Sequence, residues 1–175
     1  MGTEPIAPAL PSASEMNVED FMRSVTDELL AYFARRVALS EDAADCLSET
    51  LLVLWRRRDA LPNAHNERRA WTYGVAHRVL AVHRRTGIRQ LALSGRLRDE
   101  LRSRPMAPQS QDDAAIAALA ALTPRDRELV TLVVWDGLTI AEAGAVVGIR
   151  PDAARARYSR ARRKLRTRLL HDSHD

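Results

Sequence analysis

The stretch that decides the fold runs from Gly137 to Leu170 and reads GLTIAEAGAVVGIRPDAARARYSRARRKLRTRLL. Thr139 followed by Glu142 forms a capping box, which predicts that a helix begins directly after the threonine. Gly148 ends that helix about two turns later, and Pro151 suits the first position of the next helix. Two helices joined by a tight glycine turn, the second long and basic, predict a helix-turn-helix.

The second helix of this motif has two faces of opposite chemistry. One face is an apolar stripe at helical spacing that predicts packing on the preceding helices, and it comprises Ala154, Tyr158, Ala161 and Leu165. The other positions carry a dense run of cations, namely Arg155, Arg157, Arg160, Arg162, Arg163, Lys164, Arg166 and Arg168. A charge run alone is most often a solvated face. Because this run coincides with the second helix of a helix-turn-helix, it favours DNA binding, which released counterions drive.

The composition bounds the class of protein. The chain has 175 residues, of which 46% are hydrophobic and 29% charged, and its net charge is +4. This balance is typical of a globular protein, and the low glycine content favours helix over sheet. Cys46 is the only cysteine, so no internal disulfide can form. We find no signal peptide and no run long enough to span a membrane, which predicts a soluble, cytoplasmic protein without membrane insertion.

The pattern along the chain predicts two small helical domains. Prolines and small polar residues without periodicity indicate a disordered leader over residues 1–15. Glycines, prolines and Gln-Ser pairs indicate a flexible, basic linker over 86–111. Helical patterns then place the first domain at 16–85 and the second at 112–170, with a tail at 171–175. The expected fold class is all-α, with a helical bundle and a helix-turn-helix joined by the linker.

The first domain is expected to contain three helices. Asn17 and Ser40 are candidate N-caps for the first two. The second helix carries more apolar surface than one core contact requires, so a partner surface competes with plain solvation as the role of its charged rim. The third helix, predicted over 67–85, interleaves basic and aromatic residues beside a polar loop. That combination suits single-stranded or melted nucleic acid, although the helical spacing of Trp71 favours a core position for its ring.

The second domain begins near Asp112 with a short alanine-rich helix. Thr123 then caps a further helix, with Pro124 at its first position and Asp126 as the acid of a capping box. The helix-turn-helix follows directly. This part of the chain is therefore expected to fold as a compact group of short helices that presents the long basic one.

Two blocks of the chain together resemble the extracytoplasmic-function sigma factors of bacterial RNA polymerase, within the sigma-70 family. The stretches DAADCLSETLLVLWRRRDAL and ERRAWTYGVAHRVLAVHRR resemble region 2 of these proteins. The stretch LTPRDRELVTLVVWDGLTIAEAGAVVGIRPDAARARYSRARRKL resembles their region 4. A helix-turn-helix alone is found in many regulators, but both blocks in this order, with a linker between them, are much more specific. The resemblance covers about residues 18–85 and 112–168.

The resemblance implies a non-enzymatic promoter-specificity subunit that binds core RNA polymerase and promoter DNA. The residues implied to dock on the clamp helices of the polymerase β′ subunit are Asp45, Leu47, Glu49, Leu52 and Arg56. Those implied to bind the melted −10 element are Asn63, His65, Asn66, Arg68, Arg69 and Thr72. The β flap and an anti-sigma factor are implied as further partners by family alone.

In the region 4 block, the resemblance separates base contacts from phosphate contacts on the −35 element. The positions that reach base edges in the major groove are Arg155, Ser159 and Arg160. The positions implied for phosphates, which fix register without reading sequence, are Thr139, Arg150, Arg157 and Arg162.

Two other classes of function are considered. A helix-turn-helix regulator without polymerase docking would form a stable dimer and bind symmetric half-sites. An enzyme is disfavoured, because the histidines lie on different helix faces or in the tail, and no H-E-x-x-H, cysteine pair or phosphate-binding glycine loop occurs. No metal and no cofactor are therefore expected. Cys46, beside apolar neighbours, is interpreted as a small core residue and not as a redox sensor.

Overall fold

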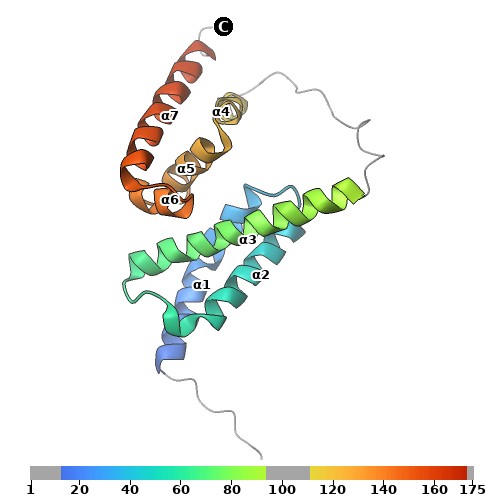
Figure 1. Cartoon of the computed structure of the whole chain (residues 1–175), viewed down its shortest axis with the longest axis vertical. Coiled ribbons are helices and arrows are strands. Elements are labelled where there is room, and N and C mark those ends of the chain that lie inside the picture. Colours follow the sequence, from blue (N-terminus) through green and yellow to red (C-terminus); the bar gives the residue numbers. More distant parts are fainter. Residues whose placement is uncertain (1–12, 94–110, 173–175) are drawn as a thin grey trace, which may run out of the picture.

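The computed structural model describes residues 13–93 and 111–172, and every regular element within these ranges is helical (Figure 1). In chain order the elements are α1 (Ala13–Ala34), α2 (Ser40–Arg56), the 3₁₀ turn η1 (Arg58–Ala60), α3 (His65–Leu93), α4 (Gln111–Ala120), α5 (Pro124–Val134), α6 (Ile140–Val146) and α7 (Pro151–Asp172). The all-α fold class predicted from the sequence is confirmed.

Helices α1, α2 and α3 pack together as the first half of the molecule. The apolar residues of α1 recur three and four positions apart, so they fall on one face and enter the core. The buried members of this face are Val18, Phe21, Val25, Leu29, Tyr32 and Phe33. Trp71 is half-buried and packs with the smaller cluster around Leu54, as its helical spacing predicted.

Two helix starts differ from the predicted ones. Helix α1 begins at Ala13, before Asn17, so the end of the predicted leader is helical; residues 1–12 lie outside the described ranges. The N-cap of α2 is Leu39, whose backbone is extended and which makes no side-chain capping bond. Ser40, predicted as that cap, is instead the first residue of the helix. Glu41 and Asp42 follow it in the first turn. Their negative charges interact favourably with the positive end of the helix dipole and stabilise this helix start without a capping side chain.

The third helix is longer at both ends than the sequence suggested. It starts at His65 and continues to Leu93, whereas the predicted helix covered 67–85. Gly87 was interpreted as part of a linker, but an isolated glycine costs a helix only about 1 kcal/mol. The residues around it include leucine, arginine and glutamine, which are good helix formers. The rest of the predicted linker, residues 94–110, lies outside the described ranges.

The second half follows its capping signals closely. The Thr123 side chain accepts a hydrogen bond from the Asp126 backbone N–H, with Pro124 in the first turn of α5. Thr139 and Glu142 form the complete capping box of α6. Gly148, with φ +72°, makes the left-handed turn between α6 and α7. The predicted helix-turn-helix is confirmed in its start, its turn and its second helix.

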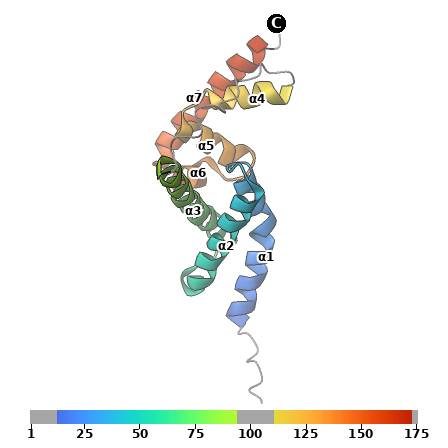
Figure 2. The same ribbon diagram turned by 90° about the vertical axis from the view of Figure 1, so that its right-hand side faces the viewer.

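The two halves lie against each other and do not stand apart. One continuous cluster of buried residues includes Tyr73 and Leu80 of α3 together with Leu129 of α5 and Ala143 of α6. Helix α6 packs on α3, and both views show this contact (Figures 1 and 2). The sequence patterns predicted each half but gave no indication of this packing, because they describe neighbours along one helix and not contacts between distant helices.

The buried thiol of Cys46 is expected to be chemically inert in the folded protein. The residue is only 2% exposed. Burial raises the pKa of the thiol, and the nearby Asp42 and Asp45 carboxylates raise it further. We therefore expect iodoacetamide to alkylate the native protein much more slowly than the denatured chain at pH 7.5, as followed by mass spectrometry. Equal rates in the two states would contradict the core position of this residue.

Candidate nucleic-acid and partner interfaces

Helix α7 presents the cationic surface that the sequence predicted. Ala154 and Ala161 are buried against the preceding helices, which fixes the rotation of α7 about its axis. The opposite side is exposed and carries most of the predicted DNA-contacting residues, namely Arg150 in the turn and Arg155, Ser159, Arg160 and Arg162 on the helix. Guanidinium groups on a long exposed helix can form bidentate bonds to guanine edges and to phosphates. This surface is chemically suited to duplex DNA.

Two residues of the predicted phosphate-binding set are instead bonded within the fold. Arg157 Nε lies 2.8 Å from Asp126 Oδ1, and this pair joins α7 to α5. Burial alone would raise the pKa of Asp126, but hydrogen bonds from Thr123 and Arg157 outweigh it and lower that pKa. The Thr139 hydroxyl donates to Glu142 Oε2 at 2.7 Å in the capping box. Arg157 and Thr139 therefore stabilise the helix-turn-helix, and their contact with phosphates remains a prediction.

An open groove of about 1020 Å³ runs beside the same helix. Its floor is apolar and its border is cationic; the lining residues are Val130, Val134, Ile140, Arg155, Tyr158, Ser159, Arg162, Arg163, Leu165, Arg166, Leu169 and Leu170. Arg160 is exposed and does not line this groove. DNA phosphates could form ion pairs with the arginines but could not pack against the apolar residues of the floor. An amphipathic segment with acidic residues would match both, so this side of α7 is also suited to a protein partner.

The loop before α3 exposes polar groups as predicted for a base-binding site. Asn63 is exposed in the loop, and His65 and Asn66 are exposed in the first turn of α3. Leu61 is buried at the start of the loop and attaches it to the first half of the molecule. The His65 ring lies edge-on to Phe21, with ring centroids 6.0 Å apart. These amide and imidazole groups can hydrogen-bond to an unpaired base.

The next turns of α3 fit the prediction less well. Arg68 Nε donates to the Pro62 carbonyl at 2.8 Å, which positions the loop. Arg69 bonds to Glu28 Oε2 at 2.9 Å and to the Asp136 carbonyl at 2.5 Å. Thr72 is fully buried, and its hydroxyl donates to the Arg68 carbonyl. Thr72 was predicted to contact the −10 element, but in this structure its side chain is buried and faces the core.

Helix α2 carries an exposed, mixed surface at the predicted docking positions. Asp45, Glu49 and Arg56 are exposed, and Leu52 is 41% exposed. Leu47 is half-buried and packs against the main core, so it offers a partner less surface than the sequence implied. A leucine exposed among charged side chains is a common arrangement in protein–protein contacts, where an apolar anchor is surrounded by a polar rim.

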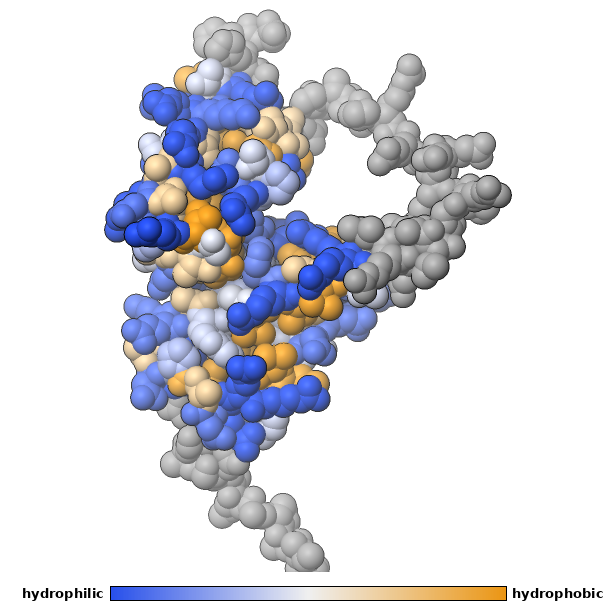
Figure 3. Space-filling view, viewed as in Figure 1, coloured by the Kyte–Doolittle hydropathy of each residue, from blue (hydrophilic) through white to orange (hydrophobic). Residues whose placement is uncertain are grey.

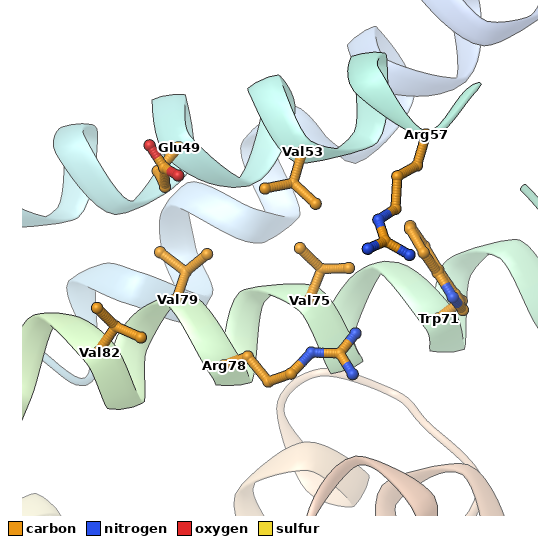
Figure 4. Close-up of a pocket in the computed structure, with 8 residues that line it drawn as sticks. All are labelled: Glu49, Val53, Arg57, Trp71, Val75, Arg78, Val79 and Val82. Atoms are coloured by element: carbon orange, nitrogen blue, oxygen red, sulfur yellow. The ribbon is translucent and has the colours of Figure 1, made fainter. Parts of the chain in front are cut away.

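Beside this surface lies a groove of about 590 Å³ between α2 and α3, which the sequence did not reveal. Its lining residues are Glu49, Val53, Arg57, Trp71, Val75, Arg78, Val79 and Val82. Val53 projects from α2 towards Val75 and Val79 of α3, while Arg57 lies beside the Trp71 ring (Figure 4). The space-filling view has an apolar patch here, bordered by hydrophilic residues (Figure 3). The groove adjoins the exposed face of α2 and extends it towards α3.

Metal-binding clusters and membrane-spanning helices are both absent from the described ranges. No group of three His, Cys, Asp or Glu side chains within residues 13–93 and 111–172 could hold a metal ion. Within the same ranges, no helix combines the length and the apolar character needed to cross a membrane. The exposed features described above are the basic helix, the polar loop, the mixed surface of α2 and the two grooves.

Comparison with known proteins gives three kinds of similarity. Residues 112–165 match the family described as Sigma-70, region 4. The chain is 36% identical over 148 residues to the ECF RNA polymerase sigma factor SigF of Caulobacter vibrioides, which covers 81% of this chain and 79% of SigF. It is 31% identical over 153 residues to the ECF RNA polymerase sigma factor BldN of Streptomyces coelicolor, covering 84% of this chain and 58% of BldN.

Solved structures share the fold. The sigma factor RpoE of Bartonella quintana, in complex with the anti-sigma factor NepR, superposes with a TM-score of 0.58 at 22% identity. That match covers 89% of this chain and 93% of RpoE. CnrH, in complex with the cytosolic domain of CnrY, gives a TM-score of 0.54 at 21% identity, covering 91% of this chain and 89% of CnrH. At these identities the likeness concerns the arrangement of helices.

Proposed function

Because the chain belongs to the extracytoplasmic-function RNA polymerase sigma factors, we propose that its exposed surfaces divide the work of promoter recognition between its two halves. As a sigma factor it directs promoter-specific initiation by binding core polymerase and the −10 and −35 elements. In our proposal, residues 16–85 act as the region 2 domain and residues 112–170 as the region 4 domain. Residues 86–93 continue α3, and the segment after them connects the two domains. The protein acts in the cytoplasm, on the polymerase.

The α2 surface is the proposed docking site for the clamp helices of the polymerase β′ subunit. The observation that carries this assignment is the exposure of Leu52 between Glu49 and Arg56 on one helix. An apolar anchor with charged neighbours supplies both contact area and orientation. Asp45 extends the charged rim, and Leu47 supports the surface from the core side. The groove between α2 and α3 adjoins the same surface and enlarges the area available to the partner.

The polar loop and α7 are the proposed DNA-binding surfaces. Asn63, His65 and Asn66 would hold an unpaired base of the −10 element. The guanidinium groups of Arg68 and Arg69 would lie near the phosphates of the same DNA strand. Arg155, Ser159 and Arg160 would reach base edges of the −35 element, and Arg150 and Arg162 would bind its phosphates. The apolar groove beside α7 shares Arg155, Ser159 and Arg162 with this DNA-binding surface, so a protein segment in it would compete with DNA. An anti-sigma factor is the proposed occupant, and the β flap of polymerase is proposed as a further partner of the second domain.

Charge reversal on the α2 surface tests the docking proposal. We expect the double variant Glu49→Arg, Leu52→Asp to lose at least tenfold in affinity for core RNA polymerase, because it reverses one charge and places a carboxylate at the apolar anchor. Binding can be measured by co-purification and by fluorescence anisotropy of labelled protein. Circular dichroism establishes that the variant is folded.

A matched control changes the same residue types on a different helix. Glu19→Arg, Leu30→Asp makes these changes on α1, where Leu30 is 39% exposed against 41% for Leu52. The control should bind polymerase like the wild type. Equal losses in the two double variants would remove α2 as the docking surface. A folded wild type that does not bind core polymerase would instead favour the dimeric helix-turn-helix regulator.

A further inference from the structure

Asp126 is an acid at the edge of the cationic surface of α7. It lies in the first turn of α5, which packs side by side with α7 (Figure 1). Its Oδ1 accepts a hydrogen bond from Arg157 Nε at 2.8 Å. The Asp126 side chain is 21% exposed and that of Arg157 is 32% exposed. The pair is therefore partly shielded from water but remains within reach of a ligand at the surface.

The Asp126 carboxylate is held on both of its oxygens. The Thr123 hydroxyl, at the N-cap of α5, donates to Oδ2 at 2.7 Å and accepts from the Asp126 backbone N–H at 3.2 Å. Arg157 occupies Oδ1. A carboxylate fixed by two hydrogen bonds in the first turn of a helix has little rotational freedom, so the guanidinium bonded to it is also held in one orientation. The start of α5 is thus a rigid support for one arginine of α7.

The charge of Asp126 acts against DNA binding. Burial raises the pKa of Asp126, but hydrogen bonds from Thr123 and Arg157, together with the charges of Arg157 and Arg160, outweigh burial and lower that pKa. The carboxyl group is therefore ionised at neutral pH. A negative charge beside Arg157 and Arg160 reduces the attraction of this side of α7 for phosphates. On electrostatic grounds alone, removing Asp126 should tighten the binding of any duplex.

The bond to Asp126 leaves the outer part of the Arg157 guanidinium available. Only Nε is bonded, and the two Nη groups have no hydrogen-bond partner within residues 13–93 and 111–172. The Nη N–H groups of arginine form a planar fork that matches a phosphate. Along the helix, Arg157 lies between the buried Ala154 and Ala161, on the flank of α7 that faces α5. A helix in the major groove has its flanks towards the DNA backbones, so a phosphate contact is expected on this flank.

We propose that Asp126 is a positioning residue for DNA binding, which holds Arg157 by Nε so that the Nη groups are presented to a phosphate of the bound duplex. Thr123 acts in turn on Asp126 by fixing the other carboxylate oxygen. The proposal rests on the function proposed above, because it takes α7 as the helix that enters the major groove. It gives an acid a favourable role in the binding of a polyanion.

Alanine at position 126 separates the two effects of the acid, because they have opposite signs. If Asp126 positions Arg157, Asp126→Ala should weaken binding to a duplex of random sequence roughly fivefold, since the guanidinium then adopts many orientations. If only charge matters, the same variant should bind more tightly than the wild type. Fluorescence anisotropy with the full chain at fixed salt measures the affinity. The matched control is Asp20→Ala, which removes an exposed acid bonded to Arg23 at 3.2 Å on α1 and should bind DNA like the wild type.

The conservative variant Asp126→Asn distinguishes positioning from a structural role. The asparagine side-chain oxygen can still accept a hydrogen bond from Arg157 Nε, while the negative charge is removed. This variant should therefore bind DNA at least as tightly as the wild type. If the pair only joined α5 to α7, both variants would lower the midpoint of thermal unfolding, and neither would lower the DNA affinity of the folded protein. Circular dichroism gives the unfolding midpoint of each variant.

A double-mutant cycle with Arg157 locates the effect. Arg157→Ala should weaken binding of the random duplex and reduce the salt dependence by about one phosphate contact. In that background, Asp126→Ala should cause no further loss, because the arginine through which Asp126 acts is absent. Arg157→Lys covers the case in which the alanine variants do not fold. It keeps the charge but lacks the planar fork, so the affinity should still fall.

Three results would overturn the proposal. They are binding by Asp126→Ala that is as tight as that of the wild type or tighter, an equal loss from Asp126→Ala in the presence and absence of Arg157, and an unchanged affinity of Arg157→Lys. Co-purification of the wild type with core polymerase is measured in parallel. Its failure would refute the proposed function as a sigma factor, whereas the anisotropy result bears on the DNA-binding surface of α7 alone.

Discussion

Replacing Gly144 by alanine is expected to destabilise the helix-turn-helix by roughly 1–3 kcal/mol, the usual cost of forcing an extra methyl group into a packed site. A Cβ atom at this position would lie 2.7 Å from the Cβ of Ala154 and 3.3 Å from the Ile149 carbonyl oxygen. Neither neighbour is the end of a flexible side chain, so α6 and α7 would have to move apart. The midpoint of thermal unfolding, followed by circular dichroism, should fall by about 2–4 °C per kcal/mol.

The same substitution at Gly74 provides a control with the opposite sign. Gly74 lies inside α3, and a Cβ built there meets nothing within 4 Å. Alanine costs less backbone entropy than glycine in a helix, so Gly74→Ala should stabilise the protein by about 0.5–1 kcal/mol. A pair of results with opposite signs would identify the contact between Gly144 and Ala154 as the cause. Equal effects of the two variants would mean that helix propensity alone decides the outcome.

Local features of the fold were predictable because they depend on neighbouring residues. The capping box at Thr139, the cap at Thr123 and the turn at Gly148 each involve groups a few positions apart, and all three are present. Where a helix end has no such signal, the predicted end differs from the one in the structure. The extension of α3 to Leu93 is an example, because Gly87 was interpreted as a break although a single glycine does not end a helix. The role of Gly144 depends on Ala154 across the turn and was not predicted.

Contacts between the halves could not be derived from patterns. Arg36 and its partners Glu128 and Asp136 are far apart in the sequence, and nothing in the residues beside each of them indicates that it is buried. Their burial depends on how α5 lies on α1 and α3. The same packing half-buries Arg69 and links it to the Asp136 carbonyl. The sequence predicted the chemistry of both halves, but only the structure reveals that the halves share a core.

Among the residues of the proposed interfaces, exposure could be predicted from the sequence, whereas bonds to distant residues could not. Exposed positions on α7 follow from the position of its apolar stripe, so Arg155 and Arg160 could be placed on the outer side from periodicity alone. Arg157 lies beside that stripe, where a guanidinium can turn back to Asp126, and periodicity does not indicate such a bond. Thr72 was predicted to bind the −10 element because it lies in the stretch that resembles region 2 of the sigma factors. Its burial illustrates that a polar residue on a basic helix can satisfy its hydroxyl through the preceding turn and face the core.

Replacing Arg160 by alanine is expected to remove much of the sequence discrimination of α7. A bidentate contact between arginine and a guanine edge contributes about 1–3 kcal/mol of discrimination, which corresponds to roughly a 5- to 150-fold loss of affinity for the preferred −35 sequence. That sequence can first be selected from a random duplex library by the wild-type protein. Anisotropy titrations at fixed salt then compare wild type and variant on the selected duplex and on a scrambled one.

The variant Arg168→Ala separates base recognition from general electrostatics. It removes the same charge from an exposed position two turns further along α7, beyond the residues proposed to reach bases. This control should weaken binding to both duplexes about equally and reduce the salt dependence by about one phosphate contact. Arg160→Ala should instead lower the ratio between the selected and the scrambled duplex. If both variants weaken the two duplexes equally, Arg160 binds phosphate only, and base reading by this helix must depend on Arg155 and Ser159, on the groove side of α7.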